Sequence, residues 1–309
     1  SRETVWSSLI ALAGADFDRL RLSNADIRDE KLSEILRSEG CDAFDVCIHF
    51  AALKSVDGSI RDPLLYYDNN VSGTLNLVRC LSDLSCKNII FSSSCTVYGS
   101  QPSPITEESQ IGVGITNPYG VSKFVCERIL KDLAVACPDT IVTSLRYFNP
   151  IGSHPSGKIG EEPLGTPANL FPYVLDVLHG KLSSLTVHGR DYATPDGTCI
   201  RDYVHVMDIA DGHVAAMEHS LSRAHNHSVY NLGTGEGTSV LEMIDAAEKT
   251  SGKKLNWTFG PRREGDLVKI YADADKAARE LGWTPKRTIE DAFRDALAFY
   301  EQENVRLLH

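Results

Sequence analysis

The sequence of 309 residues lacks an apolar run long enough to cross a membrane, so a membrane-spanning protein is not expected. It is also poor in positive charge, because the formal net charge is −11 and no basic cluster exists beyond PRREGD at 261–266. A groove for nucleic-acid phosphates is therefore not expected either. The content of 42% hydrophobic and 24% charged residues is that of a globular chain. A small molecule is the predicted partner.

The cysteines lack the spacing of a metal site. None of the eight forms a CxxC pair, and none stands at zinc-ligand distance from a histidine, so no metal is predicted. They are interpreted as reduced thiols of a cytosolic protein. The first residues, SRETVWSSLIALAG, lack the basic lead and sustained apolar core of a signal peptide, so a cytoplasmic location is predicted by default.

Short apolar runs rich in β-branched and aromatic residues predict strands at 44–52, 87–94, 141–149 and 228–233. The runs lack polar alternation, as strands covered on both faces do. Helical patterns lie between and after them, at about 63–84, 118–136, 170–180, 207–221, 238–251 and 288–303. This alternation predicts an α/β fold with a doubly wound parallel sheet.

The chain becomes rich in loops after residue 149, with proline and glycine every few residues. Long ordered loops on a regular scaffold are where binding groups collect. We therefore predict a main sheet region at 1–149 and a smaller, loop-rich substrate-binding region at 150–309. The segment at about 228–251 is expected to return to the main sheet.

The segment NPYGVSK, at 117–123, contains a tyrosine and a lysine four residues apart. On a helix, Tyr119 and Lys123 share a face, so their side chains can meet. The helix follows the second predicted strand, and ligands of parallel sheets bind beyond the carboxyl ends of strands. We expect these side chains at that rim: Lys54, Ser94, Tyr98, Phe148 and Asn149. The alternative is that the pair is only part of an exposed helix face.

A collinear set of motifs resembles the UDP-glucose 4-epimerases, of the extended short-chain dehydrogenase/reductase family. The motifs are SSSCTVYG, PYGVSK, RYFNPIGSHPSG, GTCIRDYVHVMD, YNLGTGEGTSV and PRREGD, and the match runs from about ADIRDE to ELGWTP. YxxxK alone is a weak motif, but the ordered set is specific. The resemblance implies a Rossmann-like fold. It also implies that the C4 hydroxyl of a UDP-hexose is oxidised by bound NAD and that hydride returns to the other face.

The resemblance assigns Tyr119 as the acid/base, Lys123 as its cationic partner and Ser94 as a residue that holds the reacting hydroxyl in line. Free tyrosine titrates near pH ~10, about three units too high for a base at neutral pH. A cation ~4 Å away at an effective dielectric of ~20 contributes ~4 kcal/mol, or about three units. We therefore expect Lys123, helped by the positive nicotinamide, to lower the pKa of Tyr119. The alternative for Ser94 is a serine that caps backbone groups at a strand end.

The remaining site residues are implied by the resemblance alone. The positions that match cofactor contacts, besides the catalytic three, are Asp26, Ile27, Phe50, Ala51, Ala52, Leu53, Lys54, Asn69 and Phe148. The positions that match UDP-sugar contacts are Asn149, Asn169, Leu170, Arg201, Arg263 and Asp266. An arginine fork suits a diphosphate. Without the motifs, Lys54 would be interpreted as a solvated loop lysine and the arginines as surface ion-pair residues.

Two Gly-rich features are interpreted differently. NLGTGEG, at 231–237, has the spacing GxGxG and comes late in the chain, so it is predicted to be a tight strand-to-helix turn that does not bind the cofactor. The family begins with a strand and a Gly-rich loop that holds the pyrophosphate. That unit is not among the given residues, so we expect either a fragment of a longer protein or weak NAD binding.

Alternatives to a UDP-glucose/UDP-galactose 4-epimerase stay open. One is a neighbouring enzyme, such as a UDP-N-acetylglucosamine 4-epimerase. Acceptance of N-acetylated sugars depends on the room beside the sugar, where Ile270 stands in place of the common Tyr or Cys. A dehydratase ranks low, because no acidic residue stands beside Ser94. The third alternative is a UDP-sugar-binding remnant without NAD. The resemblance also implies a homodimer through the helices at 63–84 and 118–136.

Overall fold

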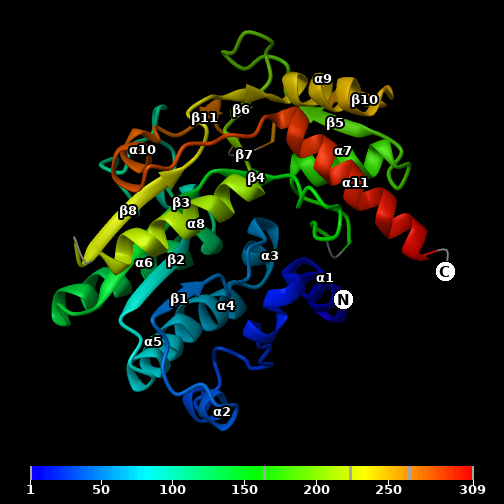
Figure 1. Ribbon diagram of the computed structural model, residues 1–309. Coiled ribbons are helices and arrows are strands. Elements are labelled where there is room, and N and C mark those ends of the chain that lie inside the picture. Colours follow the sequence, from blue (N-terminus) through cyan, green and yellow to red (C-terminus); the bar gives the residue numbers. More distant parts are fainter. Residues whose placement is uncertain (1, 163–164, 223–224, 264–265, 308–309) are drawn as a thin grey trace.

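The computed structural model describes residues 2–162, 165–222, 225–263 and 266–307, and strands and helices alternate along it (Figure 1). The main sheet has four parallel strands in the order β1-β2-β3-β8. Their bounds are β1 Val46–His49, β2 Asn88–Ser94, β3 Ile141–Tyr147 and β8 His227–Leu232. Each lies at a predicted position, so the predicted parallel α/β fold is confirmed.

Both faces of this sheet are covered, which explains why the strands lack polar alternation. Every residue of β2 is buried. Ile89 and Phe91 pack with α5 (Gly73–Asp83) and α6 (Pro118–Ala136), whereas Ile90 packs with α8 (Val206–Leu221) and α10 (Asp275–Leu281). Successive side chains of a strand point to opposite faces, so helices on both sides require apolar residues at each position.

The predicted helices are present, with one interruption. The region predicted at 63–84 consists of α4 Pro63–Tyr66, a π-helical turn Tyr67–Ser72 and α5. The other predicted helices are α6, α8, α7 Leu170–Leu178, α9 Val240–Ser251 and α11 Ile289–Leu307. The patterns missed α10 and three further helices: α1 Arg2–Ala13, α2 Leu32–Ser38 and α3 Val56–Arg61. The last two span only two turns or less, so their apolar periodicity is too short to detect.

A second group of elements lies to one side of the main sheet (Figure 1). Helices α7, α9 and α11 share one apolar cluster with β5, whose partner is β10. The short strands are β4 Asn149–Ile151, β5 Leu185–His188, β6 Ile200–Arg201, β7 Tyr203–His205, β9 Thr238–Ser239, β10 Trp257–Gly260 and β11 Lys269–Ile270. Although α9 belongs to this second cluster, β8 pairs with β3 in the main sheet. The chain therefore crosses between the two groups more than once.

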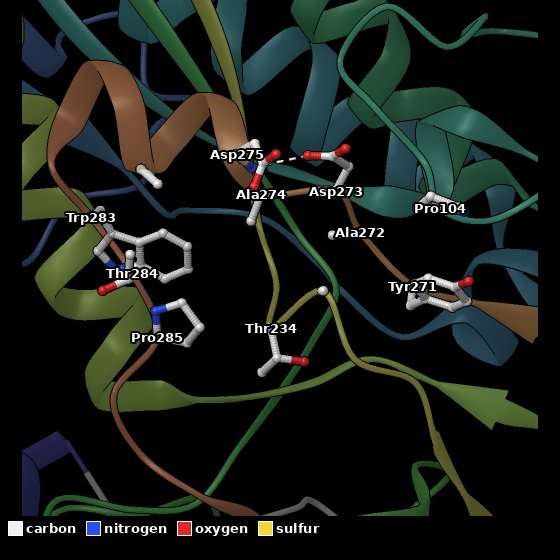
Figure 2. Close-up of a pocket in the computed structure, with 12 residues that line it drawn as sticks. Pro104, Thr234, Tyr271, Ala272, Asp273, Ala274, Asp275, Trp283, Thr284 and Pro285 are labelled. Atoms are coloured by element: carbon white, nitrogen blue, oxygen red, sulfur yellow. Dashed lines mark hydrogen bonds between the residues drawn. The ribbon is translucent and has the colours of Figure 1, made fainter.

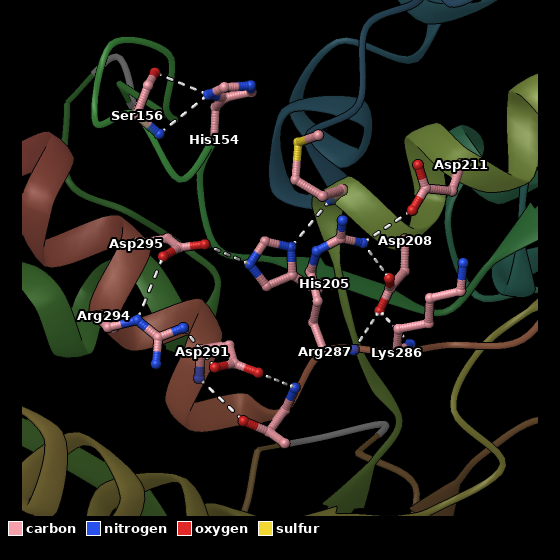
Figure 3. A network of polar contacts seen from close by, with 12 residues as sticks. His154, Ser156, His205, Asp208, Asp211, Lys286, Arg287, Asp291, Arg294 and Asp295 are labelled. Atoms are coloured by element: carbon pink, nitrogen blue, oxygen red, sulfur yellow. Dashed lines mark hydrogen bonds and ion pairs between the residues drawn. The ribbon is translucent and has the colours of Figure 1, made fainter.

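A polar network ties the start of α8 to the segment before α11 (Figure 3). The Asp208 carboxylate accepts hydrogen bonds from the backbone N–H groups of Lys286 and Arg287, each at 3.0 Å, and pairs with the Arg287 guanidinium. His205 caps α8 through Nδ1, which accepts from the Met207 N–H, and its Nε2 lies 3.4 Å from an Asp295 oxygen. This network fixes α8, which covers the sheet.

Two further observations concern the described residues as a whole. None of their helices combines the length and the apolar character that a membrane span needs. All eight cysteines are unpaired thiols, as expected from their spacing.

Candidate active site

The segment NPYGVSK forms the beginning of α6. The Asn117 side chain caps the helix by accepting a hydrogen bond from the Gly120 N–H at 2.8 Å, and Pro118 occupies the first helical position. A Cβ at Gly120 would lie 2.7 Å from Cγ2 of Ile115 and 3.2 Å from Cβ of Thr96. The absence of a side chain at Gly120 therefore lets the first turn of α6 approach the end of β2 closely.

Tyr119 and Ser94 meet at this approach. The Ser94 Oγ accepts hydrogen bonds from the Thr96 N–H at 3.3 Å and from the Thr96 hydroxyl at 3.0 Å. Its own proton is then left to donate to the Tyr119 hydroxyl, a hydrogen bond that lowers the pKa of the phenol. Ser94 thus caps the turn after β2 and also contacts Tyr119, so the two alternatives for this serine are not exclusive.

Lys123 lies one turn further along α6 and is 3% exposed. Its Nζ donates to the Ser92 carbonyl oxygen at 2.6 Å and lies 4.9 Å from the centre of the Phe91 ring. Burial lowers the pKa of Lys123 to about 8. A lysine this deeply buried is not part of an exposed helix face, which rules out the alternative for the pair.

The expected lowering of the Tyr119 pKa is wrong for the protein groups alone. Burial raises the pKa of Tyr119 to about 12, and the Ser94 hydrogen bond opposes this only in part. The reason is that Lys123 points to the strand carbonyl of Ser92 rather than to the phenol. The expected lowering assumed that the ammonium lies ~4 Å from the phenol oxygen. In the fold, the ammonium is bound to the Ser92 carbonyl of β2 instead.

The predicted cofactor segment at 50–54 follows β1. Its backbone is held by Asn70, a buried residue of the π-helical turn, whose side chain accepts from the Leu53 N–H at 2.8 Å and donates to the Leu53 carbonyl at 3.0 Å. π-Helical turns are common at functional sites. Phe50 is 57% exposed and packs on His213, with ring centres 4.7 Å apart. Ala51 is exposed and Ala52 half-buried beside it.

Four other predicted cofactor residues are Lys54, the last residue of this segment, and Asp26, Ile27 and Asn69 outside it. Asp26 pairs with Arg28, and these hydrogen bonds lower the pKa of Asp26 to about 2. The Ile27 carbonyl accepts from Asn76. The ammonium of Lys54 pairs with Glu161 at 2.7 Å, and the Asn69 side chain donates to its neighbour Asn70. The four residues come from three segments of the chain, at 26–27, 54 and 69.

Phe148 does not offer an open ring face as Phe50 does. It is 5% exposed and packs in an apolar cluster with Val97, Tyr98, Ile105 and Ala272. Tyr98, which was expected at the rim, is fully buried and donates its hydroxyl to Asn231 at 2.6 Å. Tyr98 therefore belongs to the core, and the sequence position at a strand end did not reveal this.

On the predicted substrate side, the chain turns from β3 into the second group of elements. Asn149 starts β4, and its side chain donates to the Asp202 carbonyl at 2.8 Å. Asn169 is the exposed N-terminal capping residue of α7, yet its side chain makes no capping hydrogen bond. Leu170, the next residue, is half-buried against the α7 cluster. The Asn169 amide is therefore not used by the helix that it precedes.

Three predicted substrate residues converge at β6 and β11. The Arg201 guanidinium donates to the carbonyls of Ile200 and Leu267, each at 2.8 Å, and lies 3.5 Å from the Asp266 carboxylate. Arg263 is exposed and stands before residues 264–265 of the PRREGD motif, which lie outside the described residues. Ile270 pairs with Arg201 in parallel register. The residue expected to bear on sugar size therefore lies beside a predicted diphosphate ligand.

The loop NLGTGEG is a strand-to-helix turn, as predicted, and its N–H groups bind a carboxylate of the chain itself. Asp202 is fully buried and accepts from the N–H groups of Thr234, Gly235 and Ala272, at 2.8, 3.2 and 3.0 Å. The Thr234 hydroxyl donates to it as well. Because Asp202 already satisfies these donors, they are not available to a phosphate.

A cavity of about 380 Å³ lies behind this loop (Figure 2). The lining includes Thr234, Gly235, Trp283 and the carboxylate residues Asp273 and Asp275, and none of the twelve residues drawn is a predicted site residue. Two carboxylates oppose the binding of a nucleotide diphosphate. The cavity is therefore separate from the predicted site.

Four residues near the site were not predicted. Asn70 and His213 hold the 50–54 segment. His49, at the end of β1, is 4% exposed, and its Nδ1 has no hydrogen-bond partner. The hydroxyl of Tyr147, at the end of β3, lies 2.5 Å from Nε2 of His213. His49 and Tyr147 lie within the predicted strands at 44–52 and 141–149, and only the structure shows that they are the last residues of β1 and β3. His213 lies on a helix distant in sequence.

Known proteins resemble this chain over most of its length. The family described as GDP-mannose 4,6 dehydratase matches residues 5–296. UDP-glucose 4-epimerase 2 of Arabidopsis thaliana is 50% identical over 285 residues, 92% of this chain and 80% of the relative. UDP-glucose 4-epimerase of Bacillus subtilis (strain 168) is 49% identical over 278 residues, 90% of this chain and 80% of the relative. The crystal structure of UDP-glucose 4-epimerase from Bifidobacterium longum in complex with NAD+ and UDP has a TM-score of 0.88 at 46% identity and covers 97% of this chain and 87% of that one.

The parallel sheet, the half-buried tyrosine and buried lysine beyond its strand ends and the family match define the class of protein. It is an extended short-chain dehydrogenase/reductase of the kind that modifies nucleotide sugars. Within that class, the two relatives named above at about half identity are both UDP-glucose 4-epimerases. The chain belongs to the UDP-glucose 4-epimerase family.

Proposed function

We propose that this chain interconverts UDP-glucose and UDP-galactose by transient oxidation at C4 with bound NAD, as an isomerase of galactose metabolism. The observation that carries the proposal is the contact of Tyr119 with Ser94 beyond β2, with Lys123 buried one turn away. The relatives at about half identity support the same reaction.

The residues at the end of β1 fit a dinucleotide. Phe50 is an aromatic residue that is 57% exposed and packs on His213, so it has surface left for contact with a flat ring. The unpartnered Nδ1 of buried His49 is a free acceptor nearby. When bound there, NAD supplies the acceptor of the C4 hydride, and the residues assigned to it are Asp26, Ile27, Phe50, Ala51, Ala52, Leu53, Lys54, Asn69, Ser94, Tyr119, Lys123 and Phe148.

In this proposal Tyr119 takes the proton of the C4 hydroxyl and returns it. A phenol whose pKa is about 12 is a poor base at neutral pH, so a positive charge close to it has to favour the phenolate. Ser94, already donating to the phenol oxygen, holds that oxygen in line with the sugar hydroxyl. Lys123 is held by the Ser92 carbonyl and contributes a charge below the strand end.

The substrate is assigned to the second group of elements. The UDP-sugar residues are Asn149, Asn169, Leu170, Arg201, Arg263 and Asp266. The uncommitted Asn169 amide and the exposed Arg263 favour this assignment, because each offers donors to an acidic nucleotide. A division into an NAD-binding region at 1–149 and a UDP-sugar-binding region at 150–309 follows from it. The second candidate function is a UDP-N-acetylglucosamine 4-epimerase. It depends on whether the space beside Ile270, which pairs with Arg201, admits an N-acetyl group.

Tyr119→Phe tests the proposed function. We expect the wild-type chain with NAD to interconvert the two UDP-hexoses and the variant to lose at least about a hundredfold in kcat, because the proton acceptor is gone. The dissociation constant for UDP-glucose, measured by calorimetry, should stay within about twofold. Near-normal turnover of the variant would refute the role of Tyr119. An inactive wild type that still binds UDP-glucose would instead favour the remnant without NAD.

The location and the assembly are part of the proposal. Eight unpaired thiols favour a reducing, cytoplasmic location. A homodimer is favoured by apolar side chains left exposed on the two helices assigned to it, Leu64 at 77% and Leu65 at 44% on α4, and Val135 at 71% on α6.

A further inference from the structure

One histidine outside the predicted site touches it at two points. His213 lies on α8 and is 3% exposed. Its Nε2 is 2.5 Å from the Tyr147 hydroxyl, and its Nδ1 is 2.8 Å from the carbonyl oxygen of Ile209, one turn earlier in the same helix. Both ring nitrogens therefore have fixed partners of known chemistry.

These partners determine where the protons lie. A backbone carbonyl can only accept, so Nδ1 of His213 carries the proton that it donates to Ile209. Burial lowers the pKa of His213, which keeps the ring neutral and leaves Nε2 as a bare acceptor. It follows that the Tyr147 hydroxyl donates to His213 and not the reverse.

This direction limits what Tyr147 can do beside the catalytic pair. Tyr147 is close enough to Tyr119 for a charge on one phenol to raise the pKa of the other. It also shares a hydrogen bond with the side chain of Ser92, the residue whose carbonyl holds Lys123. With its proton committed to His213, Tyr147 presents only lone pairs toward the site. It cannot act as a second acid next to Tyr119.

The same imidazole supports the ring of Phe50. The ring centres of Phe50 and His213 are 4.7 Å apart, and those of Tyr147 and His213 are 5.4 Å apart. His213 thus packs against an aromatic residue of the cofactor segment after β1 and against the last residue of β3. The helix that carries it is fixed at its start by the Asp208 network (Figure 3).

We propose that His213 is a positioning residue for the epimerase reaction. It accepts the hydrogen bond of the Tyr147 hydroxyl, so that this proton points away from the site, and it holds the Phe50 ring in place. The inference rests on the proposed function for its catalytic consequence. Its structural part, the neutral ring protonated at Nδ1, does not.

The hydrogen-bond direction is tested without any turnover. In the full chain labelled with ¹⁵N-histidine, long-range ¹H–¹⁵N spectra at neutral pH should show His213 as a neutral ring with the proton on Nδ1. Tyr147→Phe should shift the Nε2 signal and leave the Nδ1 signal in place. A charged His213, or a proton on Nε2, would overturn the proposal even if the enzyme is fully active.

The positioning role is tested by a pair of substitutions. His213→Leu removes the acceptor, whereas His213→Gln keeps an amide oxygen near the position of Nε2. We expect the leucine variant to lose between about 10- and 100-fold in kcat, with the UDP-glucose KM within about twofold, and the glutamine variant to recover most of it. Adding Tyr147→Phe to the leucine variant should cost nothing further.

A neighbouring histidine serves as the control. His219 lies on the same helix, six residues further on, with its ring edge against Tyr230. His219→Leu should leave kcat unchanged. If both His213 variants lose activity equally and in proportion to a lower thermal midpoint, the residue is only structural and the proposal fails. If the wild type lacks turnover, the proposed function fails, and the ¹⁵N spectrum still decides the direction of the hydrogen bond.

Discussion

At the scale of single residues, burial governs the candidate site more than pairing does. Tyr119 and Lys123 are four residues apart and share a helix face, yet each is perturbed mainly by removal from water. Burial moves the two pKa values in opposite directions, because it disfavours the charged form of both a phenol and an amine. A positive charge bound close to Tyr119 has to lower the pKa of the phenol again. Lys123 instead destabilises the folded state whenever the pH is below its pKa, because its buried ammonium is then charged.

The cost of burying the charged Lys123 leads to a prediction about the stability of the fold. The pKa falls from 10.5 to about 8, so the unfolded chain binds the proton more tightly and the native state loses about 3 kcal/mol below pH ~8. The hydrogen bond to the Ser92 carbonyl offsets about 1 kcal/mol of this loss in stability. Lys123→Met should therefore raise the free energy of unfolding by about 2 kcal/mol at neutral pH while turnover is lost.

Urea unfolding followed by circular dichroism measures this difference. It should be full below pH ~8 and fall as the pH rises toward 10.5, the usual pKa of a free lysine, since the lysine is then neutral in both states. Above that pH only the hydrogen bond to Ser92 distinguishes the two chains, so the wild type should be the more stable by about 1 kcal/mol. A variant that is less stable than the wild type at neutral pH would show that the ammonium is not penalised as described.

A buried ion pair beneath the site gives a second residue-scale prediction. Arg146 of β3 and Glu127 of α6 are 3% and 4% exposed and form a two-bond contact, at 2.7 and 3.0 Å. Glu127→Gln would leave a buried guanidinium without its counter-charge, so we expect a loss of about 3–5 kcal/mol in unfolding free energy.

The control lies on the same helix. Arg128 and Asp132 form an exposed pair four residues apart, with side chains 69% and 60% exposed. Asp132→Asn should cost less than about 0.5 kcal/mol in the same measurement. Equal costs for the two substitutions would contradict the assignment of Glu127 to a buried network.

At the scale of elements, the approach of α6 to β2 is what creates the site. Asn117 ends the loop and caps the helix, and Gly120 permits the close contact with the turn η3 (Cys95–Tyr98) that brings Tyr119 to Ser94. Two features of one helical turn thus set the position of the proposed acid/base. Neither Asn117 nor Gly120 is among the residues assigned to the substrate.

Gly120→Ala tests whether the close packing of α6 against Ile115 and Thr96 outweighs the higher helix propensity of alanine. In an unconstrained helix the change would stabilise by about 1 kcal/mol. Here the new Cβ would lie 2.7 Å from Ile115 and 3.2 Å from Thr96, so we expect a net loss of about 1–3 kcal/mol in unfolding free energy and a larger relative fall in kcat. Both are measured on one preparation, by thermal unfolding and by coupled assay. Adding Ile115→Ala should restore part of each, and a stabilised, fully active Gly120→Ala would disprove the contact.

At the scale of the whole molecule, the exposed apolar residues of α4 and α6 lie on helices that cover one face of the main sheet (Figure 1). A side chain such as Leu64, 77% exposed, contributes to folding only if another surface covers it. The proposed homodimer through these helices would do so.

Sedimentation velocity tests the homodimer. The wild-type chain should sediment with twice the monomer mass, and Leu64→Glu should shift it to the monomer, since a carboxylate in an apolar interface is desolvated without a partner. The matched control is Leu221→Glu on α8, where the leucine is 52% exposed on the other side of the sheet. A wild-type monomer, or equal effects of both substitutions, would contradict the proposed interface.

Apolar patterns along the chain were sufficient for the main sheet. The strands at β1, β2, β3 and β8 and the helix at 118–136 followed from local composition, because a strand covered on both faces must be apolar throughout. The short helices α2 and α3 escaped detection, because two turns or less carry too little periodicity.

By itself, the sequence determined the parallel α/β class and the family, and it predicted the pair of Tyr119 and Lys123, since these depend on local patterns and ordered motifs. Only the tertiary structure decided that Lys123 binds a strand carbonyl, that Asp202 occupies the Gly-rich loop, and that His213 reaches Tyr147 and Phe50. The physical reason is that burial, hydrogen-bond direction and the resulting pKa depend on which distant segments meet, and no spacing along one chain encodes that contact.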